Sequence, residues 1–450
     1  MFKRILIANR GEIAVRVIRC CREMGIETVA VYSEADAKSL PVMTANYAVC
    51  IGPAKASESY LNQDAILETA RQMECDAIHP GYGFLSENAD FAEKCEKNHI
   101  AFIGPSSEII RRMGDKQEAR QLMIASEVPV VPGSRELIHT VQEAEELAEK
   151  LGYPVLLKAS AGGGGKGMRK AYSKEELAGA FQTAKAEAKA AFGNDDMYLE
   201  KLIVNPRHIE FQILADRFGN TVYLGERDCS IQKNNQKLLE EAPSVGLNES
   251  LRREMGEVAV RAAKAAGYFS AGTIEFVMDA EKHYYFIEMN TRIQVEHPVT
   301  EAITDIDLIR EQIRIAAGMK LTMKQEEITI RKHAIECRIN ALTPGTISFL
   351  HFPSGYGVRT ESHVFTGYEV SPFYDSMIAK IIVSGDTRLE AVRRLRRALE
   401  ELIIEGVKTN FEFMHLLTYH PAFLKGNYNT GFWEEHHKTI EKWNEEGREQ

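Results

Sequence analysis

The sequence predicts an α/β chain that continues into α+β segments, and three observations support this. Strand-like and helix-like segments alternate through residues 1–113, which indicates a parallel sheet. A smaller α/β segment follows at about 130–203, set off by prolines and a glycine. Residues 331–434 mix strands with a basic helix. With 450 residues, 44% apolar and 27% charged, the composition is that of a globular protein of about three domains.

The N-terminal segment has the pattern of repeated βαβ units. Its Asn9–Glu12 turn falls where such units can bind a nucleotide, but no G-x-G-x-x-G accompanies it, so a dinucleotide site is the lesser interpretation. The helix after this turn is expected to end at Gly25, a residue type that favours helix C-termini. The expected elements are strands at 4–9, 28–32, 77–78 and 101–103 and a helix at 12–24.

Beyond residue 113 the pattern is less regular. Prolines and a glycine at 129–133 end a helix at 115–126. Residues 435–450 are highly charged and are expected to form an exposed helix or tail. The other expected elements are strands at 155–158, 197–199, 333–339 and 377–383, a hairpin at 273–289, and helices at 174–191, 251–266, 305–317 and 388–402.

Charge and hydropathy exclude several classes of protein. A net charge of −10 argues against nucleic acid as the main partner. No stretch approaches the ~18–20 apolar residues of a membrane span, and the N-terminus lacks the apolar core of a signal peptide. The seven cysteines are scattered without C-x-x-C spacing, which fits reduced thiols and no zinc site. We therefore expect a cytoplasmic protein.

The segment Phe286–Glu301 is the most informative in the chain. It begins as an apolar strand and then carries ionisable or amide groups at every second position: Glu288, Asn290, Arg292, Gln294 and Glu296. Alternate side chains of a strand share a face, so these groups would project together while the strand lasts. Carboxylates, an amide and a guanidinium on one face suit a site that holds a metal, binds an anion and moves a proton.

A lysine and a glycine run indicate phosphate binding. Lys158 ends a predicted strand and Gly162–Gly165 follow it, before K-G-M-R. Glycines let backbone N–H groups approach phosphate oxygens, and the lysine adds charge. The pattern is not a Walker motif. A flexible linker is the alternative, although linkers usually mix Gly with Ser or Thr between polar runs.

Two further groups of residues have competing interpretations. Glu275, opposite Glu288 in the expected hairpin, gives with Asn290 an oxygen-only set that suits Mg²⁺, but carboxylates on a solvated sheet face are the alternative. Lys233 and Lys237 can bind an anion or belong to a surface amphipathic stretch.

Two single residues also have competing interpretations. A structural thiol is favoured for Cys229 over a nucleophile, and a core position is favoured for His208 over a ligand contact.

Several long segments occur in one order: N-R-G-E-I-A-V-R, H-P-G-Y-G-F-L-S-E-N, G-D-K, K-A-S-A-G-G-G-G-K-G-M-R, N-P-R-H-I-E, E-R-D-C-S-I-Q, F-I-E-M-N-T-R-I-Q-V-E-H-P-V-T-E and H-A-I-E-C-R-I-N. Together they resemble the biotin carboxylases of the ATP-grasp superfamily over about residues 1–434. The resemblance implies a Rossmann-like pre-ATP-grasp domain at 1–113, an ATP-grasp domain at 114–330 with a mobile lid at about 130–203, and a C-terminal α+β domain at 331–446.

The same resemblance implies an activity and its partners. Biotin carboxylases use ATP, Mg²⁺ or Mn²⁺ and bicarbonate to carboxylate biotin through carboxyphosphate, as the first half-reaction of an acetyl-CoA or other acyl-CoA carboxylase. The biotin would be carried by a separate biotin carboxyl carrier protein, and carboxyltransferase subunits would complete the reaction. The Gly318–Leu321 segment superficially resembles a biotin attachment site, but its position at a helix end argues against that role. A homodimer is expected.

Carried over position by position, the resemblance implies a role for each site residue. Lys116, Lys158, Gly164 and Gly165 would hold the ATP phosphates; Glu200, Lys201 and Ile203 would form the adenine hinge, with His208 near the ribose and Gln232 and Asn235 near the nucleotide; Glu275, Glu288 and Asn290 would bind the metal; Lys237, Arg292, Gln294 and Val295 would hold bicarbonate; Glu296 would be the base, and Arg338 would stabilise the biotin enolate.

The chain departs from the family pattern in places. Asn235 stands where a histidine is common, Asp305 where glycine is common, and the segment 341–357 is shorter. These departures suggest the hypothesis of a specialised paralogue, which a deletion strain starved of malonyl-CoA would contradict.

Two rival functions remain: another ATP-grasp ligase, and an inactive nucleotide-binding protein with a regulatory role. The R-I-Q-V-E-H-P-V-T-E and E-C-R-I-N segments and the intact Lys237 and Glu296 argue against them.

Overall fold

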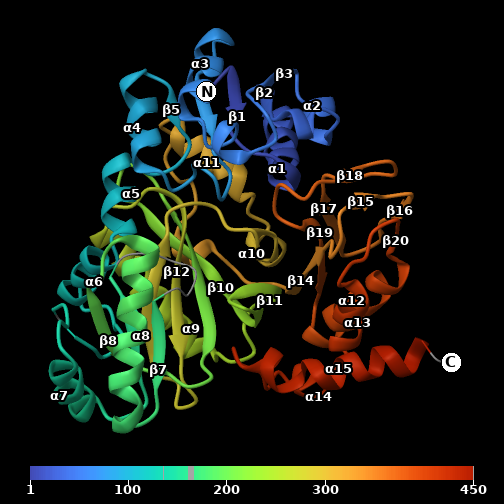
Figure 1. The fold of residues 1–450 in the computed structure, drawn as a ribbon. Coiled ribbons are helices and arrows are strands. Elements are labelled where there is room, and N and C mark those ends of the chain that lie inside the picture. The colour runs from blue at the N-terminus through green and yellow to red at the C-terminus, as the bar shows by residue number, and fades with distance from the viewer. Residues whose placement is uncertain (135, 161–166, 449–450) are drawn as a thin grey trace. The chain divides into compact units, whose positions relative to one another are not determined.

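The computed structural model describes residues 1–134, 136–160 and 167–448, traced in Figure 1. These residues form two compact units. The larger comprises Met1–Gly114, Arg207–Glu275 and Met289–Gln450, and the smaller comprises Asp115–Pro206 and Phe276–Glu288. Neither unit is one continuous segment, because the chain enters the smaller unit twice.

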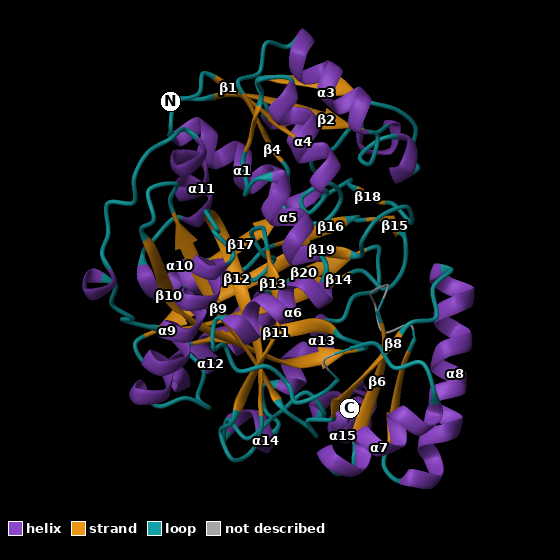
Figure 2. Cartoon of the chain, turned by 90° about the vertical axis from the view of Figure 1, so that its left-hand side faces the viewer, coloured by secondary structure: helices purple, strands orange, loops and turns teal. Residues whose placement is uncertain are grey.

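A parallel sheet forms the N-terminal part of the larger unit. Its elements are β1 (Arg4–Ile7), α1 (Gly11–Glu23), β2 (Glu27–Tyr32), α2 (Leu40–Thr44), β3 (Tyr47–Cys50), α3 (Gln63–Gln72), β4 (Ala77–His79), α4 (Ala89–Lys97), β5 (Ala101–Phe102) and α5 (Ser107–Gly114), with 3₁₀ turns at Glu34–Asp36 and Ala56–Glu58. The strand order is β3-β2-β1-β4-β5. Figure 2 shows α1 on one side of the strands and α3 and α4 on the other. The predicted parallel α/β fold of this part is confirmed, and Gly25 follows α1 with φ +71° as expected.

The turn between β1 and α1 is engaged within the protein. Asn9 donates to the backbone carbonyls of the 80–82 loop. Arg10 makes a two-contact ion pair with Asp36, at 2.7 and 2.9 Å. Glu12 pairs with a buried lysine of a later strand. These contacts give the N-R-G-E segment a structural role, and they do not support a nucleotide site at this turn.

An eight-stranded sheet joins strands from the middle and the C-terminal part of the chain. Its strands are β9 (Arg207–Ala215), β10 (Thr221–Lys233), β11 (Gln236–Ala242), β12 (Ser270–Met278), β13 (Tyr284–Asn290), β14 (His333–Asn340), β17 (Val358–Ser362) and β19 (Met377–Gly385), in the order β13-β12-β9-β10-β11-β14-β19-β17. The helices are α9 (Glu249–Ala265), α10 (His297–Thr304) and α11 (Leu308–Ala316), with a 3₁₀ turn at Gln325–Glu327. Helix α10 packs over β10, β11, β14 and β19.

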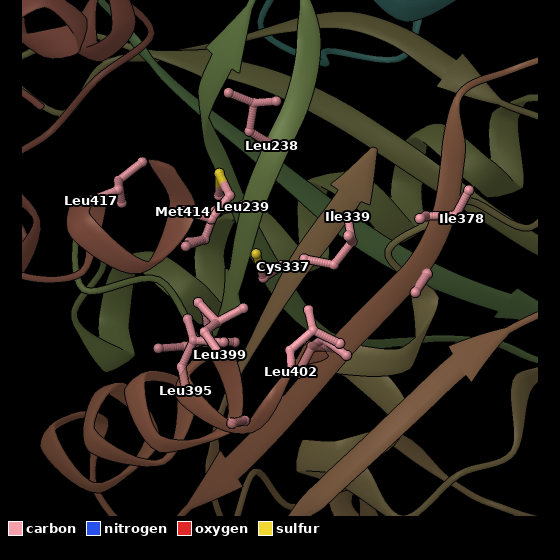
Figure 3. Close-up of a cluster of buried hydrophobic side chains, with 14 of the residues drawn as sticks. Leu238, Leu239, Cys337, Ile339, Ile378, Leu395, Leu399, Leu402, Met414 and Leu417 are labelled. Carbon is pink, nitrogen blue, oxygen red and sulfur yellow. The ribbon is translucent and has the colours of Figure 1, made fainter. Parts of the chain in front are cut away.

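The C-terminal part builds a core on one face of this sheet. Its remaining elements are β15 (Gly345–Thr346), β16 (Phe349–His351), β18 (Glu369–Val370), α12 (Arg388–Glu401), β20 (Ile403–Glu405), α13 (Phe411–Leu417), α14 (Pro421–Leu424) and α15 (Phe432–Arg448). Figure 3 shows Leu239 and Cys337 of the sheet against Leu399 of α12 and Met414 of α13. Since strand side chains alternate, the residues between these apolar ones face the other way.

The segment 341–357 contains β15 and β16, which pair with β18 and β20. One expectation for this part needs correction. The C-terminal helix is not exposed on every side, because Ile440 is fully buried and Trp443 packs against the core. The charged residues cover only the outer face, which is the pattern of an amphipathic helix.

The smaller unit has its own antiparallel sheet. Its elements are α6 (Lys116–Ala125), α7 (Val141–Leu151), β6 (Val155–Ala159), β7 (Met168–Ala171), α8 (Lys174–Phe192) and β8 (Met197–Lys201), with strand order β7-β6-β8. Thr140 and Glu143 form a capping box at the start of α7. Among the helices that the structure describes, in either unit, none combines the length and apolar character needed to cross a bilayer.

The sequence pattern misplaces two elements near the predicted site. Strand β13 ends at Asn290, so the alternating pattern does not continue as a strand to Glu296. The helix expected at 305–317 is α11, which starts later, and α10 precedes it. Asp305 ends α10 in the left-handed conformation with φ +58°, and this explains why glycine is common at that position.

Candidate functional site

The face of the eight-stranded sheet opposite the C-terminal core is charged. On β11, Glu240 alternates with the core residue Leu239, and on β14 Arg338 alternates with Ile339. Apolar residues under α10 occupy one end of this face. The other end carries the charged residues. Alternation accounts for Glu240 and Arg338, and an irregularity in the β10–β11 ladder between Leu239 and Lys237 allows Lys237 to lie on the same side.

Lys237 on β11 lies at the centre of the charged end. Its Nζ donates to Glu296 at 2.5 Å and to Glu210 at 2.6 Å, and it lies 3.3 Å from Glu275. Burial would lower the pKa of Lys237, but these carboxylates raise it well above its usual value. The ammonium group is therefore charged at neutral pH.

Glu296 is held between two cations. Its Oε1 accepts from Lys237 and its Oε2 accepts from Arg338 at 2.9 Å. Burial alone would raise the pKa of Glu296, but Lys237 and Arg338 lower it. The residue is buried and ionised, with both oxygens facing hydrogen-bond donors.

Arg227 forms a buried layer beneath these groups. Its guanidinium is fully buried and donates to Glu210, and also to Gln294 at 2.7 Å. Further bonds go to Gln212, Thr273 and Thr300. This arginine was not predicted from the sequence, yet it fixes the Gln294 side chain from β10.

The residues after β13 reach the site through a turn. Gln294 donates to Glu275 at 2.7 Å, and Asn290 donates to the same carboxylate at 2.8 Å. Arg292 donates to Glu87 of the N-terminal part at 2.9 Å and to Asn290 at 2.8 Å. The predicted residues therefore come together although the strand stops at Asn290.

Oxygen donors at this point suit a magnesium ion. Glu275 and Asn290 offer a carboxylate and an amide oxygen, which are hard ligands. Glu288, the third predicted ligand, lies on β13 in the smaller unit. The donor set therefore fits Mg²⁺ in chemical type.

His208 lies beside the carboxylates, so its side chain has partners within the protein, and whether it also contacts a ligand stays a prediction. Its Nε2 is 3.0 Å from Glu275 and 3.7 Å from Glu210. Burial lowers the pKa of His208, but Glu275 raises it to about 9 overall. The imidazole is therefore a further cation at neutral pH.

Two buried carboxyl groups lie beside Arg338 and were not predicted. Glu240 and Glu336 are direct partners in the β11–β14 ladder, so their Cβ atoms are ~4.5–5.5 Å apart. Burial raises the pKa of Glu240 to about 7, and it raises that of Glu336 well above its usual value. Arg338 donates to Glu240 at 2.7 Å. Burial thus disfavours the charged form of both carboxyl groups next to the guanidinium.

The β10–β11 hairpin explains one departure from the family pattern. Its turn is Asn234–Asn235, and both residues have positive φ, at +52° and +63°. Asparagine tolerates this geometry better than most residues, and two such residues form the favoured hairpin turn. Gln232 donates to the Cys229 carbonyl, and Lys233 lies over the ring of Trp433 on α15 at 4.4 Å. The hairpin tip thus rests on the C-terminal helix.

Cys229 on β10 is a structural thiol, as expected. Its side chain is fully buried. Burial and the nearby Glu210 raise the pKa of Cys229 well above its usual value, so it stays protonated.

The smaller unit holds the remaining predicted residues. Lys158 on β6 pairs with Glu200 on β8, and Arg120 lies 3.5 Å from the same carboxylate. Lys201 donates to the backbone carbonyls of residues 152 and 153. Of the rest, Lys116 begins α6, Ile203 follows β8, and Gly164 and Gly165 lie outside the described residues.

Some of the missed residues left a trace in the sequence. Lys380 interrupts the apolar strand M-I-A-K-I-I-V, and Glu210 and Gln212 alternate with apolar residues in β9. A polar residue inside a buried strand needs a partner, so such interruptions point to a polar face. Arg227 and Glu87 have no comparable signal, because each lies in a stretch that is already polar.

The arrangement suits chemistry on a small anion. Lys237, Arg292 and Arg338 supply positive charge, and Glu296 supplies an ionised base among them. An oxyanion can displace the carboxylates from these cations and be deprotonated by Glu296.

Comparisons with known proteins agree with this geometry. Residues 1–110 match the biotin carboxylase N-terminal domain, residues 115–324 match the ATP-binding domain of the carbamoyl-phosphate synthase L chain, and residues 336–435 match the biotin carboxylase C-terminal domain. The architecture is therefore the three-domain one that was expected. The limits expected at 113/114 and 330/331 stay predictions.

Relatives match over nearly the whole chain. Biotin carboxylase 1 of Bacillus subtilis is 55% identical and covers 96% of this chain and 98% of its own. A pyruvate carboxylase subunit of Methanothermobacter thermautotrophicus is 50% identical, covering 98% and 91%. The biotin carboxylase domain dimer of Hydrogenobacter thermophilus 2-oxoglutarate carboxylase, solved with MgADP, ADP and bicarbonate, superposes with a TM-score of 0.92 at 49% identity, covering 98% and 99%. This chain belongs to the biotin carboxylase family, whose members are ATP-dependent ligases.

Proposed function

We propose that the chain carboxylates biotin with bicarbonate and ATP, through carboxyphosphate, on a separate biotin carboxyl carrier protein. The observation that carries this proposal is Glu296, an ionised carboxylate bonded to both Lys237 and Arg338. Bicarbonate is a poor nucleophile until it is held and deprotonated, so it needs cations and a base on one surface.

The residues divide this work between them. Lys237 and Arg292 attract bicarbonate, Gln294 and Val295 orient it, and Glu296 removes its proton. Arg227 fixes Gln294 from below, through the 2.7 Å bond between them. Once bicarbonate neutralises part of the positive charge, the pKa of Glu296 rises toward its usual value and it becomes a stronger base.

The nucleotide is assigned to the groups with phosphate-binding chemistry. Lys116, Lys158 and the Gly164–Gly165 turn would hold the phosphates of ATP, with Glu200, Lys201 and Ile203 at the adenine. Mg²⁺, held by Glu275, Glu288 and Asn290, would neutralise the phosphate charge during transfer.

Arg338 serves the second step. Its guanidinium bonds Glu240 and Glu296. When Glu296 accepts a proton its hold on Arg338 weakens, and the guanidinium can stabilise the enolate of biotin.

ATP hydrolysis by the purified chain tests the proposal. We expect turnover that requires bicarbonate, is stimulated by free biotin and yields carboxybiotin. A carbamoyl-phosphate or purine-type ligase would show no biotin stimulation, and an inactive regulatory protein would bind nucleotide without turnover. Either result would overturn the proposal.

We further propose that the chain is a homodimer, that it works with carboxyltransferase subunits, and that acetyl-CoA or another acyl-CoA is the final acceptor. Relatives of nearly equal identity carry the names pyruvate carboxylase and 2-oxoglutarate carboxylase, so the acceptor is the point to test. Co-purification with the native carrier and carboxyltransferase, assayed with each acceptor, decides it. Light scattering measures the dimer.

A further inference from the structure

A fully buried lysine, Lys380 on β19, contacts the turn that carries the predicted base. Its Nζ donates to the backbone carbonyl of Val295 at 2.6 Å. The same Nζ lies 3.0 Å from Glu12 at the start of α1. Side-chain exposure is 0% for Lys380 and 2% for Glu12, so this is a buried ion pair between parts of the chain that are distant in sequence.

Other charges surround Lys380, and one of them, Glu336 on β14, helps to raise its pKa without an ion-pair contact. The direct ladder partners of Lys380 are Arg338 on β14 and Glu361 on β17. Glu361 is already bonded to two arginines, Arg19 and Arg359, and Arg338 is bonded to Glu240 and Glu296. Within the described residues, Glu12 is the carboxylate with an ion-pair contact to the ammonium group.

The carbonyl that Lys380 binds belongs to the peptide bond between Val295 and Glu296, the predicted base. Because a peptide bond is planar, the orientation of this carbonyl sets the backbone from which the Glu296 side chain extends. At the other end of the Glu296 side chain, Lys237 and Arg338 bind the carboxylate. The turn lies outside regular secondary structure after β13, so its geometry depends on such contacts.

We propose that Lys380 is a positioning residue for the bicarbonate site, which it orders by binding the Val295 carbonyl while Glu12 neutralises its charge. This inference rests on the function proposed above. The Glu12–Lys380 pair links the first helix of the chain to this lysine, so the conspicuous N-R-G-E segment stabilises the buried ammonium group.

Three variants separate the two contacts of Lys380. Lys380→Met removes both the ion pair and the bond to Val295. Glu12→Gln weakens the ion pair and leaves the bond. The double variant removes both charges, and it should be more stable than Lys380→Met because the Glu12 carboxylate is no longer buried without its cation. Arg252→Met is the matched control, since it breaks the ion pair between Arg252 of α9 and Glu226 of β10. The other bonds described for these two side chains go to Glu249 and to the backbone of Ser244, and not to the turn.

The expected results differ between stability and activity. In Lys380→Met, the KM for bicarbonate should rise or kcat fall by about tenfold or more, because a bond from a charged donor is lost. The double variant should recover melting temperature but not activity. Glu12→Gln and Arg252→Met should lose melting temperature and stay within about threefold of wild-type bicarbonate kinetics.

Wild-type kinetics in the double variant, together with a restored melting temperature, would show that Lys380 is only a structural counter-ion and would overturn the proposal. This outcome can be measured even if Lys380→Met alone fails to fold. Hydrogen exchange at 291–297 gives a readout independent of turnover. It should quicken in the double variant and not in Glu12→Gln, and unchanged exchange would contradict the proposal. If the wild-type chain shows no biotin-stimulated turnover, the proposed function fails, while the exchange result still decides the role of Lys380.

Discussion

Replacing the predicted base by its amide, Glu296→Gln, tests the proposed mechanism most directly. The substitution keeps the size of the side chain and removes its charge. Glu296 Oε1 accepts from Lys237 at 2.5 Å and Oε2 accepts from Arg338 at 2.9 Å. An amide can satisfy only one of these donors, because its nitrogen is itself a donor.

The structure gives the size of both expected effects. One of two charge-assisted bonds is lost, so the free energy of unfolding should fall by about 2 kcal/mol. An amide cannot accept the proton of bicarbonate, so kcat should fall by ~10²–10⁴, the usual contribution of a general base. Since charge is removed and not added, binding of bicarbonate should not weaken.

Biotin-stimulated ATP hydrolysis at varied bicarbonate measures the effect. Glu301→Gln is the matched control, because Glu301 is a buried carboxylate that also accepts from two guanidiniums, Arg16 at 3.0 Å and Arg359 at 2.7 Å. It should lose similar stability and keep its turnover. Unchanged turnover in Glu296→Gln, or an equal loss in Glu301→Gln, would refute the assignment of the base.

Three other outcomes follow from particular contacts. Burial would raise the pKa of Glu241, but its partners His333 and Arg388 lower it to about 2. The folded protein therefore gains stability from the ionised carboxylate, and ~3 kcal/mol of this stability should be lost as pH falls from about 4.5 to about 2. Urea unfolding across this range should show a flatter pH dependence in Glu241→Gln. Asp305→Gly should raise the melting temperature by relieving a left-handed residue, with a gain of about 1 kcal/mol and unchanged activity. Trp433→Ala should quicken hydrogen exchange at 233–237, because the ring beneath Lys233 is lost, while Trp433→Phe should do so less.

The fold was largely predictable where one physical rule dominates. Parallel strands buried on both faces read as apolar runs between helices, and the N-terminal sheet follows that pattern. Gly25 ended its helix as expected. The alternation across β13 failed after Asn290, because a tertiary turn held by Glu87, Arg227 and Lys380 replaces the strand there.

The site was only partly predictable for a related reason. The family resemblance named Lys237, Glu296 and Arg338, and the structure brings them into contact. Their supporting residues lie on other strands, far away in sequence, so no local pattern reveals Arg227 or the Glu240–Glu336 pair. Burial decides their chemistry, and burial of a charge cannot be judged before the neighbouring strands are known.

The contact between the hairpin tip and the last helix provides a built-in optical probe. The chain has two tryptophans, Trp433 and Trp443, and both lie on α15. Trp433 lies beneath Lys233 and stacks on His437. Intrinsic tryptophan emission therefore comes from one helix, next to the hairpin that carries Gln232 and Asn235. A change in that emission on adding a nucleotide would report movement of this hairpin in an otherwise unlabelled protein.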